Sequence, residues 1–461
     1  MRRFIALGGM VCTAALIGPL IVSRAATAAD KDPNLLAFEN ASGQLRTFNV
    51  GGALDLDNPF FRDLGTNGRA CVTCHQPDNA WTITPANVQA RFAASLGTDP
   101  IFRNNDGSNC EGTASLSSDA YSLLLTRGLI RVSINVPIGA EFVIDGVEDP
   151  YLCGAPLTQA SMYRRPLPST NLKFLTAVMW DGRESLPTRS IFDDLMHQSN
   201  EATIGHAQAA LPLTPQERRQ IVEFELGLFS AQTRDNEAGN LDAQGANGGP
   251  HALSGQPFFT GINDPVGLNP TGAPFTPNVF TLFNAWGSLK SSENNPFTNV
   301  RRSIARGQNI FNTKTFTISG VAGLNGQTFS NGVTLPASFS GTCTICHDTP
   351  NAGDHSVKAP LDIGLTEPAR APYLPVYTLR HLSSGATVRT TDPGRAMITG
   401  KWADVGKFKG PILRALAARA PYFHNGSAAT LEEAIQFYED RFSIGLTAQE
   451  KADLAAFLRA L

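Results

Sequence analysis

Apolar residues recur at helical spacing in two similar segments of the chain, residues 214–226 and 447–458. Each segment begins with the pattern Thr-x-x-Glu, in which the two side chains satisfy the first unpaired amides of a helix. Corresponding apolar positions follow, such as Ile221 and Leu454, at a spacing typical of an amphipathic helix with one buried face. The pattern therefore predicts a repeated helix, one at the end of each half of the chain.

A continuous apolar run, residues 4–22, lies near the start of the chain. It follows the basic stretch Met1-Arg2-Arg3 and precedes small residues that end at Ala29. This order is typical of a secretory signal peptide. We therefore expect residues 1–29 to be removed, Cys12 with them, and the mature chain to be a soluble periplasmic protein without a membrane segment.

Residues 231–298 lack helical periodicity and are rich in Gly, Asn and Pro, which favour loops. We interpret this stretch as a long ordered linker between two domains, residues 34–230 and residues 299–461. The helical segments predict a mainly α fold with long loops and few strands. A formal net charge of -3 with 17% charged residues offers no basic surface for nucleic acid.

Two five-residue stretches share one pattern, Cys71-Val-Thr-Cys74-His75 and Cys343-Thr-Ile-Cys346-His347. In a c-type haem, two such thiols add to the porphyrin vinyl groups and the adjacent histidine binds the iron. A zinc site would need further Cys or His nearby, and a redox dithiol would not need the histidine. We therefore predict two covalently bound haem c groups in two cytochrome c-like domains, with His75 and His347 as proximal iron ligands.

Two of the 7 cysteines remain once the haem motifs and the signal peptide are set aside. Cys110 and Cys153 are an even remainder in an exported chain, which predicts one structural disulfide inside the first domain. A redox-active pair would be expected to show Cys-x-x-Cys spacing, which these two residues lack.

Further motifs follow in order along the chain: Trp180-Asp-Gly-Arg183, a run from Asp392-Pro-Gly-Arg395 to Phe423-His424-Asn-Gly426, and Thr430-Leu431-Glu-Glu433. With the haem motifs they cover most of the mature chain, which resembles the bacterial dihaem cytochrome c peroxidases and the related MauG enzymes. The resemblance implies that the N-terminal haem reacts with hydrogen peroxide, that the C-terminal haem passes in electrons, and that Trp180 lies between them. It also implies a small electron-donor protein, a cytochrome c or a cupredoxin.

The first iron is expected to have a free face. In the peroxidases a loop histidine after the first motif can cap this iron in the resting state, but residues 76–103 contain no histidine here. We therefore expect an open first haem that needs no reductive activation. His197 and His206 remain candidates for its distal side, with ordinary helix or core positions as the alternative.

The second iron has two candidate sixth ligands. The resemblance places Tyr438 at the ligand position, which is methionine in the peroxidases and tyrosine in MauG. Met397 is the rival, because many single-haem cytochromes take a methionine from a loop ahead of the last helix. The remaining alternative is that Tyr438 is a buried tyrosine with an ordinary hydrogen bond.

Peroxide cleavage needs a group that moves a proton between the two oxygens. The family supplies a Gln and a Glu after the Trp-Asp-Gly-Arg stretch. Here the Gln position falls on Ser190, whereas Glu201 lies one place from the acid position and Gln198 lies close to it. We therefore expect Glu201 and Gln198 to be catalytic, with a solvated helix carboxylate as the alternative for Glu201. Trp180 is expected to be catalytic on the resemblance, with a core aromatic residue as the alternative.

The remaining polar positions are expected to support the haems. We expect Arg183 to pair with a haem propionate or with Asp181. His424 is a candidate for a hydrogen bond near the second haem or the domain interface.

A calcium ion between the domains is a further property of the family. Counting back from Trp180 puts Arg165 where the family has an asparagine ligand. A cation at that position argues against calcium unless Asn171 or water substitutes for the missing ligand.

Three functions remain open. The first is peroxide reduction with electrons from a small redox protein. The second is MauG-like oxidation of a protein or organic substrate through a high-valent haem state. The third is electron transfer alone, with both irons six-coordinate.

Overall fold

The computed structural model of this protein describes residues 34–290 and 295–461, so the predicted signal peptide lies outside the described residues. Helical residues, 31% of the structure, outnumber the 17% in strands, although strands are more numerous than the few expected. The helices of the described chain are α1 (Pro85–Ser95), α2 (Ser122–Arg127), α3 (Ile191–Gly205), α4 (Pro215–Gly227), α5 (Pro250–Ser254), α6 (Thr298–Thr313), α7 (Ala396–Thr399), α8 (Leu431–Phe442) and α9 (Ala448–Arg459).

The strands are mostly short and antiparallel. They form a sheet of order β1-β2-β6-β7, a sheet of order β11-β10-β4 and the pairs β3-β5 and β8-β9. Their bounds are β1 (Leu35–Asn40), β2 (Gly43–Asn49), β3 (Ile130–Asn135), β4 (Phe142–Glu148), β5 (Gln159–Arg164), β6 (Leu228–Asp235), β7 (Gly239–Asn240), β8 (Phe316–Ser319), β9 (Ser338–Gly341), β10 (Val376–His381) and β11 (Thr387–Thr390).

The two predicted repeat helices are confirmed as α4 and α9, each with a complete capping box. The Thr214 hydroxyl accepts the Glu217 amide at 3.2 Å, and the Glu217 carboxylate accepts the Thr214 amide at 2.9 Å. Thr447 and Glu450 repeat this arrangement at 3.2 and 2.8 Å. Helix α9 packs closely on α6. At Gly307 of α6 the approach is so close that a Cβ atom would lie 2.0 Å from a backbone oxygen of α9.

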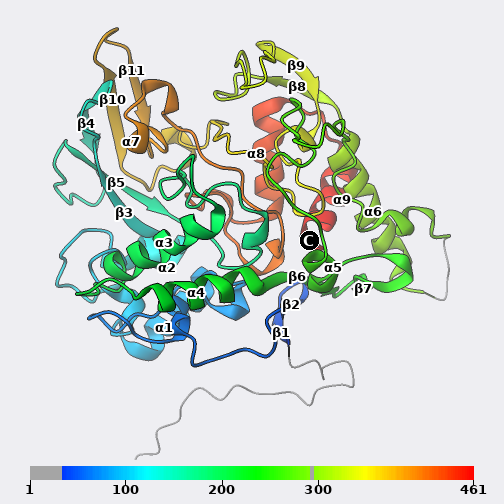
Figure 1. The fold of residues 1–461 in the computed structure, drawn as a ribbon, viewed down its shortest axis with the longest axis horizontal. Coiled ribbons are helices and arrows are strands. Elements are labelled where there is room, and N and C mark those ends of the chain that lie inside the picture. The colour runs from blue at the N-terminus through cyan, green and yellow to red at the C-terminus, as the bar shows by residue number, and fades with distance from the viewer. Residues whose placement is uncertain (1–33, 291–294) are drawn as a thin grey trace, which may run out of the picture.

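The segment 231–298, expected as a linker, forms part of the core of the second half. Phe280, Phe283 and Trp286 are fully buried and pack with Phe311 of α6 and Phe457 of α9. The sequence did not predict this role, because the buried aromatic residues of the segment follow neither a helical nor a strand period. Figure 1 shows α6, α8 and α9 together on the side of the molecule that this segment covers.

The two halves of the chain share secondary structure. Strand β4 of the first half pairs with β10 of the second, and Figure 1 shows them side by side. A buried ion-pair network also joins the halves, in which Arg164 contacts Asp181 and, at 2.7 Å, Asp392. The two halves are therefore joined by a shared sheet and by a buried ion-pair network.

The predicted disulfide between Cys110 and Cys153 is confirmed and lies in the first half. Among residues 34–290 and 295–461, no helix has the length and apolar character needed to cross a membrane.

Candidate haem-binding sites

The two Cys-x-x-Cys-His motifs adopt the same local structure. Cys71–Thr73 and Cys343–Ile345 each form one turn of 3-10 helix, and each following cysteine ends the turn. The His75 Nδ1 lies 3.0 Å from the Trp81 carbonyl oxygen, and the His347 Nδ1 lies 2.6 Å from the Gly353 carbonyl oxygen. Both acceptors lie six residues after the histidine.

These carbonyls fix which ring nitrogen is available. A carbonyl can only accept, so Nδ1 carries the proton and the lone pair of Nε2 is free for a metal. Burial lowers the pKa of His75 and of His347 to about 4, which keeps both rings neutral at physiological pH. A neutral, oriented imidazole is the form that binds haem iron.

The four motif cysteines are free thiols and face two deep cavities. Burial raises the pKa of Cys343 and of Cys346 to about 12, and it raises the pKa of Cys71 and Cys74 as well. A redox-active dithiol instead has a lowered pKa on at least one sulfur. The thiol environment therefore fits haem attachment better than disulfide exchange.

Buried cations around the first cavity have fewer partners than they need. Arg414 is 2% exposed, and its Nε and one terminal nitrogen have no hydrogen-bond partner in the described structure. Burial lowers the pKa of Arg414 to about 9 and the pKa of the neighbouring Lys409 to about 8. Such groups are costly unless an anion is present, and haem propionates in the cavity would supply that anion.

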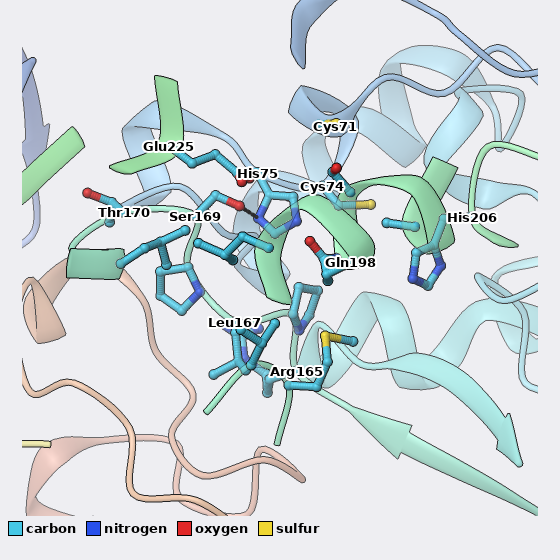
Figure 2. A pocket seen from close by; sticks show the side chains of 18 of the residues that line it. Cys71, Cys74, His75, Arg165, Leu167, Ser169, Thr170, Gln198, His206 and Glu225 are labelled. Atoms are coloured by element: carbon cyan, nitrogen blue, oxygen red, sulfur yellow. Dashed lines mark hydrogen bonds between the residues drawn. The ribbon is translucent and has the colours of Figure 1, made fainter. Parts of the chain in front are cut away.

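The first cavity carries polar side chains on an otherwise largely apolar wall. Helix α3 presents Leu195, Gln198, Ala202 and the following His206 to it. The His206 Nδ1 lies 2.5 Å from an Asp106 carboxylate oxygen. Figure 2 shows Gln198 and His206 on one side of His75, with Ser169 and Glu225 on the other.

Glu201 does not reach this cavity, contrary to the sequence expectation. It is exposed, and its carboxylate accepts a hydrogen bond at 3.2 Å from the adjacent Asn200. The cavity face of α3 is centred between Ser199 and Ala202, and Glu201 lies more than about 100° away from that centre around the helix, on the side exposed to solvent. His197 is also directed away from the cavity and pairs with Glu184 at 2.6 Å.

Two residues at the first cavity were missed by the sequence reasoning. Ser169 Oγ lies 3.0 Å from His75 Nδ1, as the dashed line in Figure 2 marks. Glu225 of α4 is buried, its Oε2 has no hydrogen-bond partner in the described structure, and burial raises its pKa to about 7. The sequence could have indicated Glu225, because it is a glutamate on the predicted buried face of an amphipathic helix.

The second cavity is more aromatic. Tyr438 of α8 lines it together with His347 and Phe311. Within the described chain the Tyr438 hydroxyl has no hydrogen bond, and burial raises the pKa of this phenol. Met397 instead is 2% exposed and packs with Phe142 and Tyr377 in a core away from the cavity, so the two candidate ligands are separated in space.

Trp180 lines both cavities. Its indole nitrogen donates to the Arg165 carbonyl oxygen at 2.8 Å, and its ring meets the His424 ring edge to face with centroids 6.1 Å apart. His424 is buried at the second cavity, where it stacks on Phe408 with centroids 4.0 Å apart. Burial lowers the pKa of His424 to about 4, so this ring is also neutral.

Arg165 and Arg183 both have well-defined partners. The Arg165 guanidinium donates to the carbonyl oxygens of Ile83 at 2.7 Å and Arg419 at 3.1 Å, which belong to different halves of the chain. A side-chain cation therefore already joins the carbonyls of the two halves, which argues against calcium at this position. Arg183 pairs with Asp181 at 3.1 Å and also lines the first cavity.

Asn171, the proposed substitute ligand for calcium, is engaged elsewhere. Its side-chain amide donates to the Ser230 carbonyl oxygen at 2.9 Å and accepts the Ser230 amide at 2.9 Å. These two hydrogen bonds hold Asn171 against strand β6.

The two Cys-x-x-Cys-His motifs and the cavities that they face fit the attachment of haem c, and the curated proteins to which the chain is similar are cytochrome-c peroxidases. The cytochrome-c peroxidase IdrP2 of Denitromonas iodatirespirans is 34% identical over 135 residues, which are 26% of this chain and 36% of that protein. The cytochrome-c peroxidase IdrP1 of Pseudomonas sp. is 34% identical over 139 residues, again 26% and 36%. The cytochrome c551 peroxidase of Nitrosomonas europaea is 30% identical over 125 residues, or 27% and 31%.

The resemblance to cytochrome c peroxidases is thus confirmed for the matched part, which spans about a third of the length of these curated relatives. No family model matches the chain. A crystal structure of a MauG-like protein associated with microbial copper homeostasis is similar at 17% identity, over 88% of this chain and 91% of that chain, with a TM-score of 0.39. A score of this size is too low to establish a common fold.

Proposed function

We propose that this chain is a periplasmic dihaem c-type oxidoreductase that reduces hydrogen peroxide to water with electrons from a small redox protein. The observation that carries the proposal is the pair of similar cavities with Trp180 in the wall of both. The relatives named as cytochrome-c peroxidases support the reaction class. The balanced reaction consumes one peroxide, two electrons and two protons, and it releases two waters.

When bound, a haem with one histidine ligand supplies an iron site at which the O–O bond of peroxide can be cleaved. The protein's part at the first cavity is to orient His75 through the Trp81 carbonyl and Ser169. The Gln198 amide replaces Glu201 as the group of α3 that faces the cavity, where it can hydrogen-bond a small polar substrate. Glu225 offers a further buried carboxyl group in the same cavity wall.

The second cavity suits electron transfer. Its wall is mostly apolar and aromatic, and the Tyr438 phenol would be a further ligand for the iron of a haem held by His347. Electrons from a small cytochrome c or cupredoxin would enter here and pass to the first cavity by way of Trp180. The hydrogen bond from Trp180 to the Arg165 carbonyl holds the indole between the two sites.

A second candidate function is the oxidation of a protein or organic substrate, and Tyr438 is the observation that favours it. An anionic phenolate ligand stabilises ferric and higher oxidation states more than a methionine thioether does. The two functions differ in their need for an external reductant. Peroxide turnover that requires a reduced donor protein supports the first, whereas peroxide-dependent oxidation of an added substrate without a donor supports the second.

The electron paramagnetic resonance spectrum of the ferric holoprotein, before and after stoichiometric hydrogen peroxide, tests both enzymatic proposals. A high-spin signal that disappears with peroxide is the expected result, because it reports a first iron with a free face. Two low-spin signals that do not change when peroxide is added, whether or not the protein has been partially reduced, would instead identify an electron-transfer protein without peroxide chemistry.

A further inference from the structure

Three side chains of metal-binding type meet beside the second cavity. Asp264, Asp348 and His355 are buried, and one ligand atom of each lies within 4.8 Å of the others. Asp264 comes from the segment 231–298, whereas Asp348 directly follows His347. The cluster therefore lies where that segment packs against the loop after the second haem motif.

Asp264 has a carboxylate oxygen left for a ligand. Asp264 is 1% exposed, and its Oδ2 accepts the amides of Val266 and Leu268 at 3.0 and 2.8 Å. Its Oδ1 has no hydrogen-bond partner in the described structure. A fully buried carboxylate oxygen without a partner is costly, so an unpaired atom at this position points to a missing ligand.

The other two members are held from outside the cluster. The Asp348 oxygens accept the amide and the hydroxyl of Ser356, both at 2.7 Å. The His355 Nδ1 lies 3.3 Å from the Ala359 carbonyl oxygen, which leaves Nε2 for a metal. These contacts orient ligand atoms in the way that supporting hydrogen bonds orient the ligands of known metal sites.

The charges of the cluster are not balanced by the described protein. Asp264 and Asp348 form no ion pair with a lysine, arginine or histidine in residues 34–290 and 295–461. The three members also form no hydrogen bond with one another in that part of the chain. Two buried carboxylates at this distance repel each other unless a cation lies between them.

We propose that Asp264, Asp348 and His355 bind one divalent transition-metal ion of the zinc or manganese type. Two carboxylate oxygens and one imidazole nitrogen are a donor set of this class, whereas calcium takes six to eight oxygen ligands. The ion would join the segment 231–298 to the loop that follows His347. The inference is independent of the reaction proposed above, because it concerns a structural cation.

Metal titration of the holoprotein tests the site. Protein with both haems attached is treated with a chelator, dialysed, and titrated with Zn²⁺ and with Mn²⁺, and the bound metal is measured by mass spectrometry. We expect one equivalent of zinc or manganese beyond the two haem irons, and an increase in thermal stability on binding. Asp264→Asn and His355→Gln should each weaken binding by at least about 100-fold.

A matched variant separates the site from surface binding. Asp242→Asn changes an exposed carboxylate of the same segment and should bind metal as the unchanged protein does. The visible haem spectrum reports whether each variant has folded with both haems, and it does so without any activity measurement. The proposal is overturned if the unchanged protein binds no stoichiometric metal, if Asp264→Asn and His355→Gln bind it equally well, or if calcium binds and zinc and manganese do not.

Discussion

The two cavities have the same Cys-x-x-Cys-His motif and different walls. In each, the Nδ1 of a neutral histidine donates a hydrogen bond to the backbone carbonyl of the residue six positions later. The first cavity adds the amide of Gln198 and the carboxyl of Glu225, whereas the second adds the phenol of Tyr438 among aromatic rings. In the proposed function the shared motif would hold a haem in each cavity, and the side chains around it would decide whether the iron meets a small polar substrate or only exchanges electrons.

Replacing each proximal histidine gives the largest expected effect. His75→Gly should abolish the spectral change on peroxide addition, with a loss in rate of at least about 100-fold, because the ligand of the reactive iron is removed. His347→Gly should keep a single reaction with peroxide and lose steady-state turnover with a reduced donor. Stopped-flow and steady-state kinetics of the two variants measure these losses, and the reverse assignment of losses would exchange the roles of the two cavities.

Substituting Tyr438 tests the difference between the walls of the two cavities. Tyr438→Met should raise the reduction potential of the second haem by on the order of 0.1 V, because a thioether favours the ferrous state more than a phenolate does. Spectroelectrochemical titration of both haems measures the shift. Met397→Leu is the matched control and should leave both potentials unchanged, since Met397 packs in a separate core. An equal shift in the two variants would contradict ligation by Tyr438.

Trp180 is expected to connect the two cavities. Trp180→Phe should slow electron transfer from the second haem to the first by about 30-fold, or about 2 kcal/mol in barrier. The matched control is Trp402→Phe, because Trp402 stacks on His381 with centroids 5.1 Å apart and lines neither cavity. Rapid-mixing kinetics of half-reduced protein with peroxide compares the two. Equal rates in both variants would remove Trp180 from the electron path.

Local patterns in the sequence predicted the parts of the sites that depend on nearest neighbours. The Cys-x-x-Cys-His turns, the capping boxes of α4 and α9 and the remaining cysteine pair each follow from a few adjacent residues or from simple counting. Trp180 was placed by resemblance, and the structure shows it in the wall of both cavities.

Features that depend on distant contacts were not predictable in the same way. Glu201 does not line the first cavity, because successive side chains of a helix differ in direction by about 100° and the neighbouring Ala202 is the residue that faces the cavity. The buried aromatic residues of the segment 231–298 and the pairing of β4 with β10 join residues far apart in the sequence. Such contacts leave no period that one sequence can reveal.

Helix α3 offers a paired test of that correction. Gln198→Ala should lower the second-order rate with peroxide by about 10-fold, because it removes an amide from the cavity wall. Glu201→Ala should leave the rate unchanged, because Glu201 is exposed to solvent. A loss in Glu201→Ala that matches or exceeds the loss in Gln198→Ala would restore Glu201 as the catalytic acid.

The capping boxes give the smallest expected effect and compare the two halves in stability. Thr214→Ala and Thr447→Ala should each lower the free energy of unfolding by about 1 kcal/mol at pH 7, because each leaves amides of the first helical turn unpaired. The shift of the denaturant midpoint measures the loss, and Thr→Ser at the same positions is the control that keeps the hydroxyl. A Ser variant as unstable as the Ala variant would contradict capping as the cause.

The contribution of Glu450 to the second capping box should also depend on pH. The hydrogen bond from the Thr447 amide lowers the pKa of Glu450 to about 2, below the ordinary value of 4.5. A carboxyl with a lowered pKa in the folded state contributes stability that is present above pH 4.5 and lost as the pH falls towards 2. The difference in stability between Glu450→Gln, which keeps an acceptor for the Thr447 amide, and the unchanged protein should therefore shrink between pH 4.5 and pH 3. A constant difference over that range would mean that the Glu450 charge takes no part in the cap.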